Sequence, residues 1–112
     1  MKIAVLDNII DTELIYCISP INESHYNYHG FVFTINMFSC NGIDIVLTID
    51  DYEPEKWEKF TKSVSIQEYH KLLNNTDYKK KFPKSYIAIN TLRDNLIDLW
   101  SNNKETMPRL TF

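Results

Sequence analysis

The stretch FVFTINMFSCNGIDIVLTID, residues 31 to 50, carries the clearest structural signal in the sequence. Two runs rich in β-branched and aromatic residues, which favour strands, flank the pair Asn41-Gly42. Asn-Gly is typical of a two-residue type I′ turn, because both central residues of that turn need a positive φ. The pattern therefore predicts a β-hairpin with a positive φ at Gly42 and with Phe38 opposite Ile45.

The predicted hairpin has apolar residues on both faces, so it should lie centrally in a sheet and be covered on part of each face. Upstream, residues 2–6 read KIAVL and predict a short strand. Residues 9–19 fit two structures, since their β-branched content favours a strand and their apolar spacing favours one face of a helix. We interpret them as a helix and keep a strand as the alternative.

Downstream, Pro54 suits the first turn of a helix. The sequence from Ser65 to Glu68 predicts a capping box that opens a second short helix. Residues 85–90, SYIAIN, read as a short buried strand, and a final helix follows from Asn90 or Thr91. On that helix Trp100 is expected in the core, whereas Trp57 is expected to be half-exposed.

These elements predict a single α+β domain covering residues 1–112. Its antiparallel sheet is built on the central hairpin, at about residues 31–50, with two or three helices packed on one side. Residues 104–112 are expected to be a frayed tail or an edge strand.

Composition limits the class of protein. The chain is 44% hydrophobic and 24% charged, which is typical of a globular domain. Cys17 and Cys40 lie in apolar contexts, and we interpret both as buried thiols in a reducing compartment. The N-terminal segment has no signal-peptide pattern, and no run approaches the ~20 apolar residues of a membrane span. The sequence therefore predicts a cytoplasmic protein without membrane contact.

Glycine content argues against several enzyme classes. The chain has only two glycines, Gly30 and Gly42. A phosphate-binding loop, a dinucleotide-binding fingerprint and a nucleophile elbow all need glycines at fixed spacing. None of these motifs can be built here, so we predict a protein that is not an enzyme and that has no cofactor and no metal.

Two alternative functions can each be assigned to particular residues. His25 and His29 are four residues apart and are the best candidates for a metal site or a small enzyme, against the alternative of a tyrosine-rich loop. Lys79 to Lys84, with Phe82 among the lysines, fits an accessory nucleic-acid-binding surface. The sequence pI of about 5.5 makes nucleic acid an unlikely partner.

The acidic stretch after the hairpin favours a protein partner. Residues 1–58 hold ten acids and two lysines, whereas residues 59–112 hold five acids and ten bases, so the halves are either internally complementary or matched to a charged partner. A helix start benefits from one or two acids, and this stretch has more. The predicted partner-binding residues are Asp44, Asp50, Asp51, Tyr52, Glu53, Glu55, Trp57 and Glu58.

In size, in its abundance of Asn, Ile, Lys and Tyr, and in the acidic face of residues 44–58, the chain resembles the small immunity proteins of bacteria. Those proteins are paired with secreted or contact-delivered toxins. The resemblance rests on general character rather than on a motif. It implies a cytoplasmic inhibitor that covers the active site of one cognate toxin, often a basic nuclease.

Overall fold

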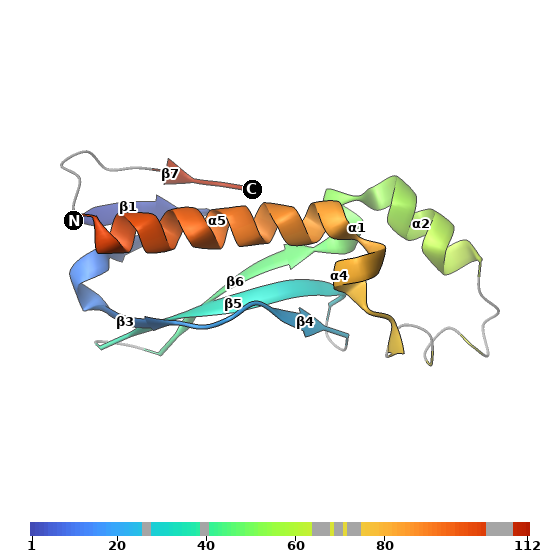
Figure 1. The fold of residues 1–112 in the computed structure, drawn as a ribbon, viewed down its shortest axis with the longest axis horizontal. Coiled ribbons are helices and arrows are strands. Elements are labelled where there is room, and N and C mark those ends of the chain that lie inside the picture. The colour runs from blue at the N-terminus through green and yellow to red at the C-terminus, as the bar shows by residue number, and fades with distance from the viewer. Residues whose placement is uncertain (26–27, 39–40, 64–67, 69–70, 72–74, 103–108) are drawn as a thin grey trace.

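The structure is a computed structural model that describes residues 1–25, 28–38, 41–63, 68, 71, 75–102 and 109–112. It is an α+β domain in which a long helix lies along an antiparallel sheet (Figure 1). The molecule is elongated, with principal extents of 52 × 24 × 20 Å. The predicted fold class is therefore confirmed.

Strand β5 (Gly30–Met37) lies at the centre of the main sheet. It pairs antiparallel with β6 (Ile43–Thr48) along one edge, as the predicted hairpin requires. Along its other edge it pairs with β3 (Ile15–Ile18) and with β4 (Asn22–Ser24), each over a different half of its length. The two short strands therefore act as one edge strand that is interrupted between residues 18 and 22.

The register of this hairpin differs from the predicted one. Ile45 lies opposite Phe33 rather than opposite Phe38, a shift of five residues, and Gly42 does not have a positive φ. An odd shift exchanges the two faces of a strand. The observed pairing puts the buried side chains of both strands on one face, whereas the tight turn would have put Thr34 opposite the buried Ile49. Burial of the apolar face therefore outweighs the preference of Asn-Gly for a tight turn.

A tight two-residue turn does occur, but in the N-terminal hairpin. Strand β1 (Lys2–Val5) pairs with β2 (Asn8–Asp11), and Leu6 in the connection has a φ of 53°. A short strand, β7 (Arg109–Leu110), pairs parallel with the other edge of β1.

Residues 9–19 are not a helix, so that interpretation is wrong. They contain most of β2, a short 3₁₀ helix, η1 (Thr12–Leu14), and strand β3. The apolar spacing that fits a helix does not match the burial, because Leu14 is exposed and a bulge in β3 leaves both Tyr16 and Cys17 exposed. The predicted burial of Cys17 is therefore wrong as well, and Cys40 lies outside the described residues.

Helix α5 (Pro83–Ser101) replaces both the predicted strand at residues 85–90 and the predicted final helix. The strand prediction is wrong because alternate residues do not share one environment: Ile89 is buried, whereas Ile87 is 60% exposed. The buried positions instead recur every three or four residues, as on one face of a helix. They are Ser85, Ile89, Leu92, Leu96 and Leu99.

One core joins the sheet to α5, which contacts β5 and β6 along its length (Figure 1). Arg93 on α5 also donates to the backbone oxygen of Ser19 at 2.7 Å, which ties the helix to the interrupted edge strand. Fully buried side chains in this core include Ile3, Val5, Phe31, Phe33, Ile35, Ile45, Ile49, Tyr78, Phe82, Ile89 and Leu96.

Three short helices gather at one end of the molecule (Figure 1). Helix α1 (Ile49–Tyr52) follows β6 directly, and α2 (Pro54–Lys62) begins at the predicted proline. Helix α4 (Tyr78–Lys81) precedes α5. The second helix predicted from Ser65 falls mostly outside the described residues. Within the part of the chain that is described, no helix has the length and apolar character needed to cross a membrane.

Replacing Gly30 with Ala should be strongly destabilising, because the new Cβ would collide with the backbone carbonyl oxygen of Leu47 on the paired strand. A backbone atom within a sheet cannot move aside without breaking the pairing. We expect a loss of unfolding free energy at or above the upper end of the about 1–3 kcal/mol typical of overpacking, measured by urea denaturation.

Gly42→Ala is the matched control for that substitution. Its Cβ would lie 2.5 Å from Thr34 Cγ2, a side-chain atom that can rotate away, so the loss should be smaller. If Gly42→Ala proved to be the more destabilising of the two, the tight-turn register would be correct and the observed register would be wrong.

Candidate functional site

The acidic residues that were predicted to bind a partner take several different positions in the structure. On α1, Asp50, Asp51 and Tyr52 are exposed, and Tyr52 shows 44% of its surface to solvent. Thr48 precedes this helix, and its hydroxyl donates to Asp51 Oδ2 at 2.5 Å. The carboxylate of Asp51 therefore stabilises the end of β6 while it remains open to solvent.

Glu53 has an internal role. Its Oε2 accepts hydrogen bonds from the backbone N–H of Ser85 at 3.2 Å and from the Ser85 hydroxyl at 2.5 Å. Ser85 is fully buried in the first turn of α5, where backbone N–H groups lack partners within the helix. A carboxylate at that position also interacts favourably with the helix dipole. Glu53 therefore caps α5 from the segment between α1 and α2, and it is not available for a partner.

Trp57 also points inward. Its ring lies 5.2 Å from that of His29, 5.6 Å from that of Phe60 and 5.7 Å from that of Phe82, measured between centroids. Trp57 and Trp100 are both half-buried, so the half-exposed position predicted for Trp57 is confirmed and the core position predicted for Trp100 is wrong. Trp57 therefore belongs to the aromatic packing that holds α2 in place.

The remaining three acids divide between the sheet and α2. Asp44 lies near the start of β6, and its carboxylate accepts a hydrogen bond from the Thr34 hydroxyl at 2.7 Å. Most of the strand therefore separates Asp44 from α1. Glu58 pairs with Lys62 one helical turn away at 2.6 Å, and this lysine lowers the pKa of the Glu58 carboxyl. Glu55 is exposed in the first turn of α2.

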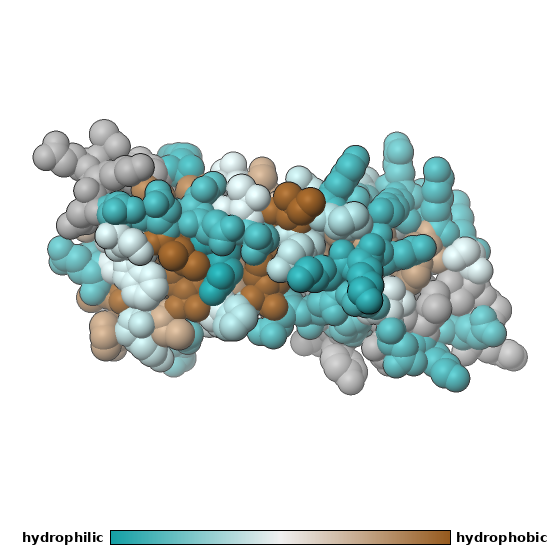
Figure 2. Space-filling view, in the orientation of Figure 1, coloured by the Kyte–Doolittle hydropathy of each residue, from teal (hydrophilic) through white to brown (hydrophobic). Residues whose placement is uncertain are grey.

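Lysines from the second half of the chain lie beside these acids. A shallow groove is lined by Tyr52, Glu53, Pro54, Glu55, Lys56, Lys59 and Lys84. In Figure 2 hydrophilic side chains cover the end of the molecule that carries α1, α2 and α4. Acids from the first half of the sequence and lysines from the second half therefore line the same groove at one end of the fold.

The lysine-rich segment does not present an aromatic residue for base stacking. Phe82 is fully buried, and two of the ammonium groups lie over rings of the protein itself. Lys79 Nζ is 4.6 Å from the centroid of Tyr86, and Lys81 Nζ is 5.7 Å from that of Phe60. Stacking of a nucleobase on Phe82, as the nucleic-acid alternative requires, is therefore blocked in this structure.

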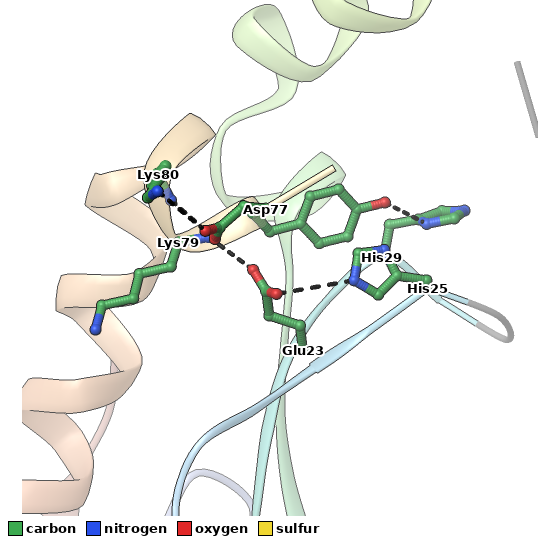
Figure 3. Close-up of polar contacts among 7 residues, drawn as sticks. Glu23, His25, His29, Asp77, Lys79 and Lys80 are labelled. Carbon is green, nitrogen blue, oxygen red and sulfur yellow. Dashed lines mark hydrogen bonds and ion pairs between the residues drawn. The ribbon is translucent and has the colours of Figure 1, made fainter. Parts of the chain in front are cut away.

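The two histidines lie against buried Tyr78 (Figure 3). His29 Nδ1 is 2.8 Å from the Tyr78 hydroxyl, and the His25 ring stacks on the Tyr78 ring at 4.3 Å. His25 Nε2 also lies 3.9 Å from Glu23 Oε2, whose other oxygen accepts from the backbone N–H of Lys79. The cluster links β4 and the start of β5 to α4.

Burial lowers the pKa of His29, and the nearby His25 lowers it further, while Asp50 acts in the opposite direction. Both histidine rings are packed against aromatic rings. Among the described residues, no group of three or more His, Cys, Asp or Glu side chains is placed to hold a metal ion.

No family model matches this chain, and the comparisons with curated proteins and with solved structures found no match.

One exposed surface was not predicted from the sequence. Phe38 is 75% exposed and Tyr16 is 52% exposed, and their rings lie 5.1 Å apart. Leu14 is next to them, because its carbonyl oxygen accepts from the Phe38 backbone N–H. The tight-turn register concealed this pair by placing Phe38 opposite Ile45. An isolated bulge such as that at Tyr16 has no reliable signature in a single sequence.

Replacing Glu53 with Ala should destabilise the fold, because it removes the cap of α5 and leaves the Ser85 hydroxyl buried without this acceptor. The expected loss of unfolding free energy is about 1–3 kcal/mol. Glu55→Ala, two residues away and exposed, is the control and should change the value by less than about 0.5 kcal/mol. Equal effects of the two substitutions would show that Glu53 is not a cap.

Proposed function

We propose that this chain is a cytoplasmic immunity-type inhibitor that neutralises a cognate toxin, a basic nuclease, by covering its active site. The docking surface is the exposed acidic surface of α1 and the start of α2. We define this α1 acidic surface as Asp50, Asp51, Tyr52 and Glu55. Glu53 and Trp57 are left out because they are half-buried and make internal contacts, whereas Asp51 remains exposed although it accepts from Thr48.

The observation that supports this proposal is a group of exposed acids that form no ion pair among the described residues. Within the described residues, no ion pair joins Asp50 or Glu55 to a base, although α2 carries lysines. Neighbouring carboxylates that are not paired repel one another, which destabilises the fold slightly. A complementary basic surface on a partner would turn that repulsion into attraction.

Tyr52 gives the α1 acidic surface a candidate anchor. It is the exposed aromatic residue between the acids, and it lines the groove with Glu55. Tyrosine is enriched among interface residues that dominate binding energy, whereas carboxylates mainly affect association rate and specificity. Tyr52 would therefore determine how long the complex lasts, and the acids would determine how fast it forms.

The lysines beside this surface refine the expected partner. Lys56, Lys59 and Lys84 border the same groove and reduce the net negative field at longer range. A partner that fits must place positive groups on Asp50 and Asp51 while it keeps positive groups away from the lysines. Such alternation favours one cognate toxin over other basic proteins, because like charges across an interface are unfavourable.

The test is a pull-down from the native host with the tagged chain, followed by measurement of association and dissociation rates for the captured protein. Asp50→Asn/Asp51→Asn should slow association and reduce its dependence on salt, because electrostatic steering contributes about 10–10³-fold to association rates. Tyr52→Ala should mainly speed dissociation, by a loss of at least about 1 kcal/mol of binding free energy.

Phe38→Ser is the matched control, since it changes the other exposed aromatic surface. It should leave both rates unchanged. If Phe38→Ser abolishes binding while the α1 variants bind normally, the α1 acidic surface is not the docking site. If the captured partner is an acidic protein, or if the pure chain does not reduce the activity of the captured protein, the inhibitor proposal fails.

A further inference from the structure

His29 connects the sheet to all three short helices. Its backbone oxygen accepts from the N–H of Ile49 in α1 at 2.9 Å, and its ring bonds to Tyr78 of α4 at 2.8 Å. The ring also stacks on Trp57 of α2, with centroids 5.2 Å apart and planes inclined by 27°. One residue just before β5 therefore touches α1, α2 and α4, and the first two of these helices carry the α1 acidic surface.

Several titratable groups surround this ring (Figure 3). From β4 come Glu23 and, just after the strand, His25; from α1 comes Asp50, and from α4 comes Tyr78. Glu23 lies 3.9 Å from His25 and also accepts from the Lys79 backbone N–H at 2.7 Å. When His25 is protonated, its positive charge lies near the His29 ring and opposes the protonation of His29.

We propose that His29 is a proton-sensitive joint, which holds α1, α2 and α4 on the sheet when neutral and loosens them when protonated in mild acid. Neutral His29 can accept the Tyr78 hydroxyl proton at Nδ1, whereas the imidazolium has donors only. The imidazolium must instead donate to the Tyr78 oxygen, so the hydroxyl proton must turn away from Nδ1, and the charge must be held against aromatic rings. The consequence for partner binding, weaker docking on the α1 acidic surface in acid, rests on the proposed function; the joint itself does not.

The direction in which pH changes the stability follows from the shift in the pKa of His29, on which opposing effects act. Burial and the charge of His25 lower the pKa of His29 below its ordinary value of 6.5, while Asp50 raises it. The stacked indole of Trp57 also favours a cation. Because the folded pKa is below the unfolded one, this residue contributes no destabilisation above about pH 6.5. It destabilises the fold as pH falls from that value through the folded pKa.

The first experiment follows Trp57 fluorescence in the isolated chain. A protonated imidazole stacked on an indole quenches its emission, so Trp57 reports the charge of His29 directly. In Trp100→Phe, emission should fall as pH is lowered from about 8 to 5, with a midpoint below 6.5. Trp57→Phe, which retains only the distant Trp100, should show no such transition.

Substitutions around the ring give three separable results. His29→Gln should abolish the transition although His25 and His70 remain. His25→Gln should raise the midpoint, because it removes a positive charge near the ring, and Asp50→Asn should lower it. A midpoint above 6.5, or a transition that survives in His29→Gln, would overturn the proposal, because stacking or another group would then control the signal.

The second experiment separates the joint from its effect on binding. The melting temperature of the native chain should fall more between pH 7.5 and about 5.5 than that of His29→Gln. With the captured partner, affinity should fall on acidification in the native chain and fall less in His29→Gln. Equal acid sensitivity of the two chains overturns the coupling and leaves the inhibitor proposal standing; the fluorescence results stand even if no partner is captured.

Discussion

The fold depends on the register between β5 and β6. With Phe33 opposite Ile45, the odd-numbered residues of both strands point to one face, and this face receives α5. A shift by any odd number of residues would turn one strand over and expose its apolar side chains. The position of α5, and with it the attachment of every element at its N-terminal end, follows from this pairing.

Polar contacts then determine the position of α5 along the sheet. Arg93 binds the backbone oxygen of Ser19 near the middle of the helix, and Glu53 caps its first turn at Ser85. Apolar contacts are not directional, so they would permit neighbouring positions of the helix. These hydrogen bonds join groups far apart in the sequence and select one position. The same bond through Glu53 holds α1 and α2 at the end of α5.

Charge has a double role at that end of the molecule. Glu53 and Glu58 stabilise helices through Ser85 and Lys62, whereas Asp50 and Glu55 remain exposed without an ion pair among the described residues. A sequence count treats these carboxylates alike. In the structure, Glu53 joins its segment to α5, Glu58 pairs with a lysine at the surface, and Asp50 and Glu55 are open to solvent. The contacts of His29 join the helices of this end, α1, α2 and α4, to the sheet.

The sequence by itself determined the α+β class, the central hairpin, the strand β1 and the proline that starts α2, because each depends on local pattern or backbone chemistry. Tertiary structure decided the register, the continuous helix α5 and the inward positions of Glu53 and Trp57. A single sequence shows which residues are apolar and favour burial, but it does not show which surface of the fold will cover them. The Asn41-Gly42 turn was therefore overridden by apolar packing, and an acid near a helix start proved to cap a different helix.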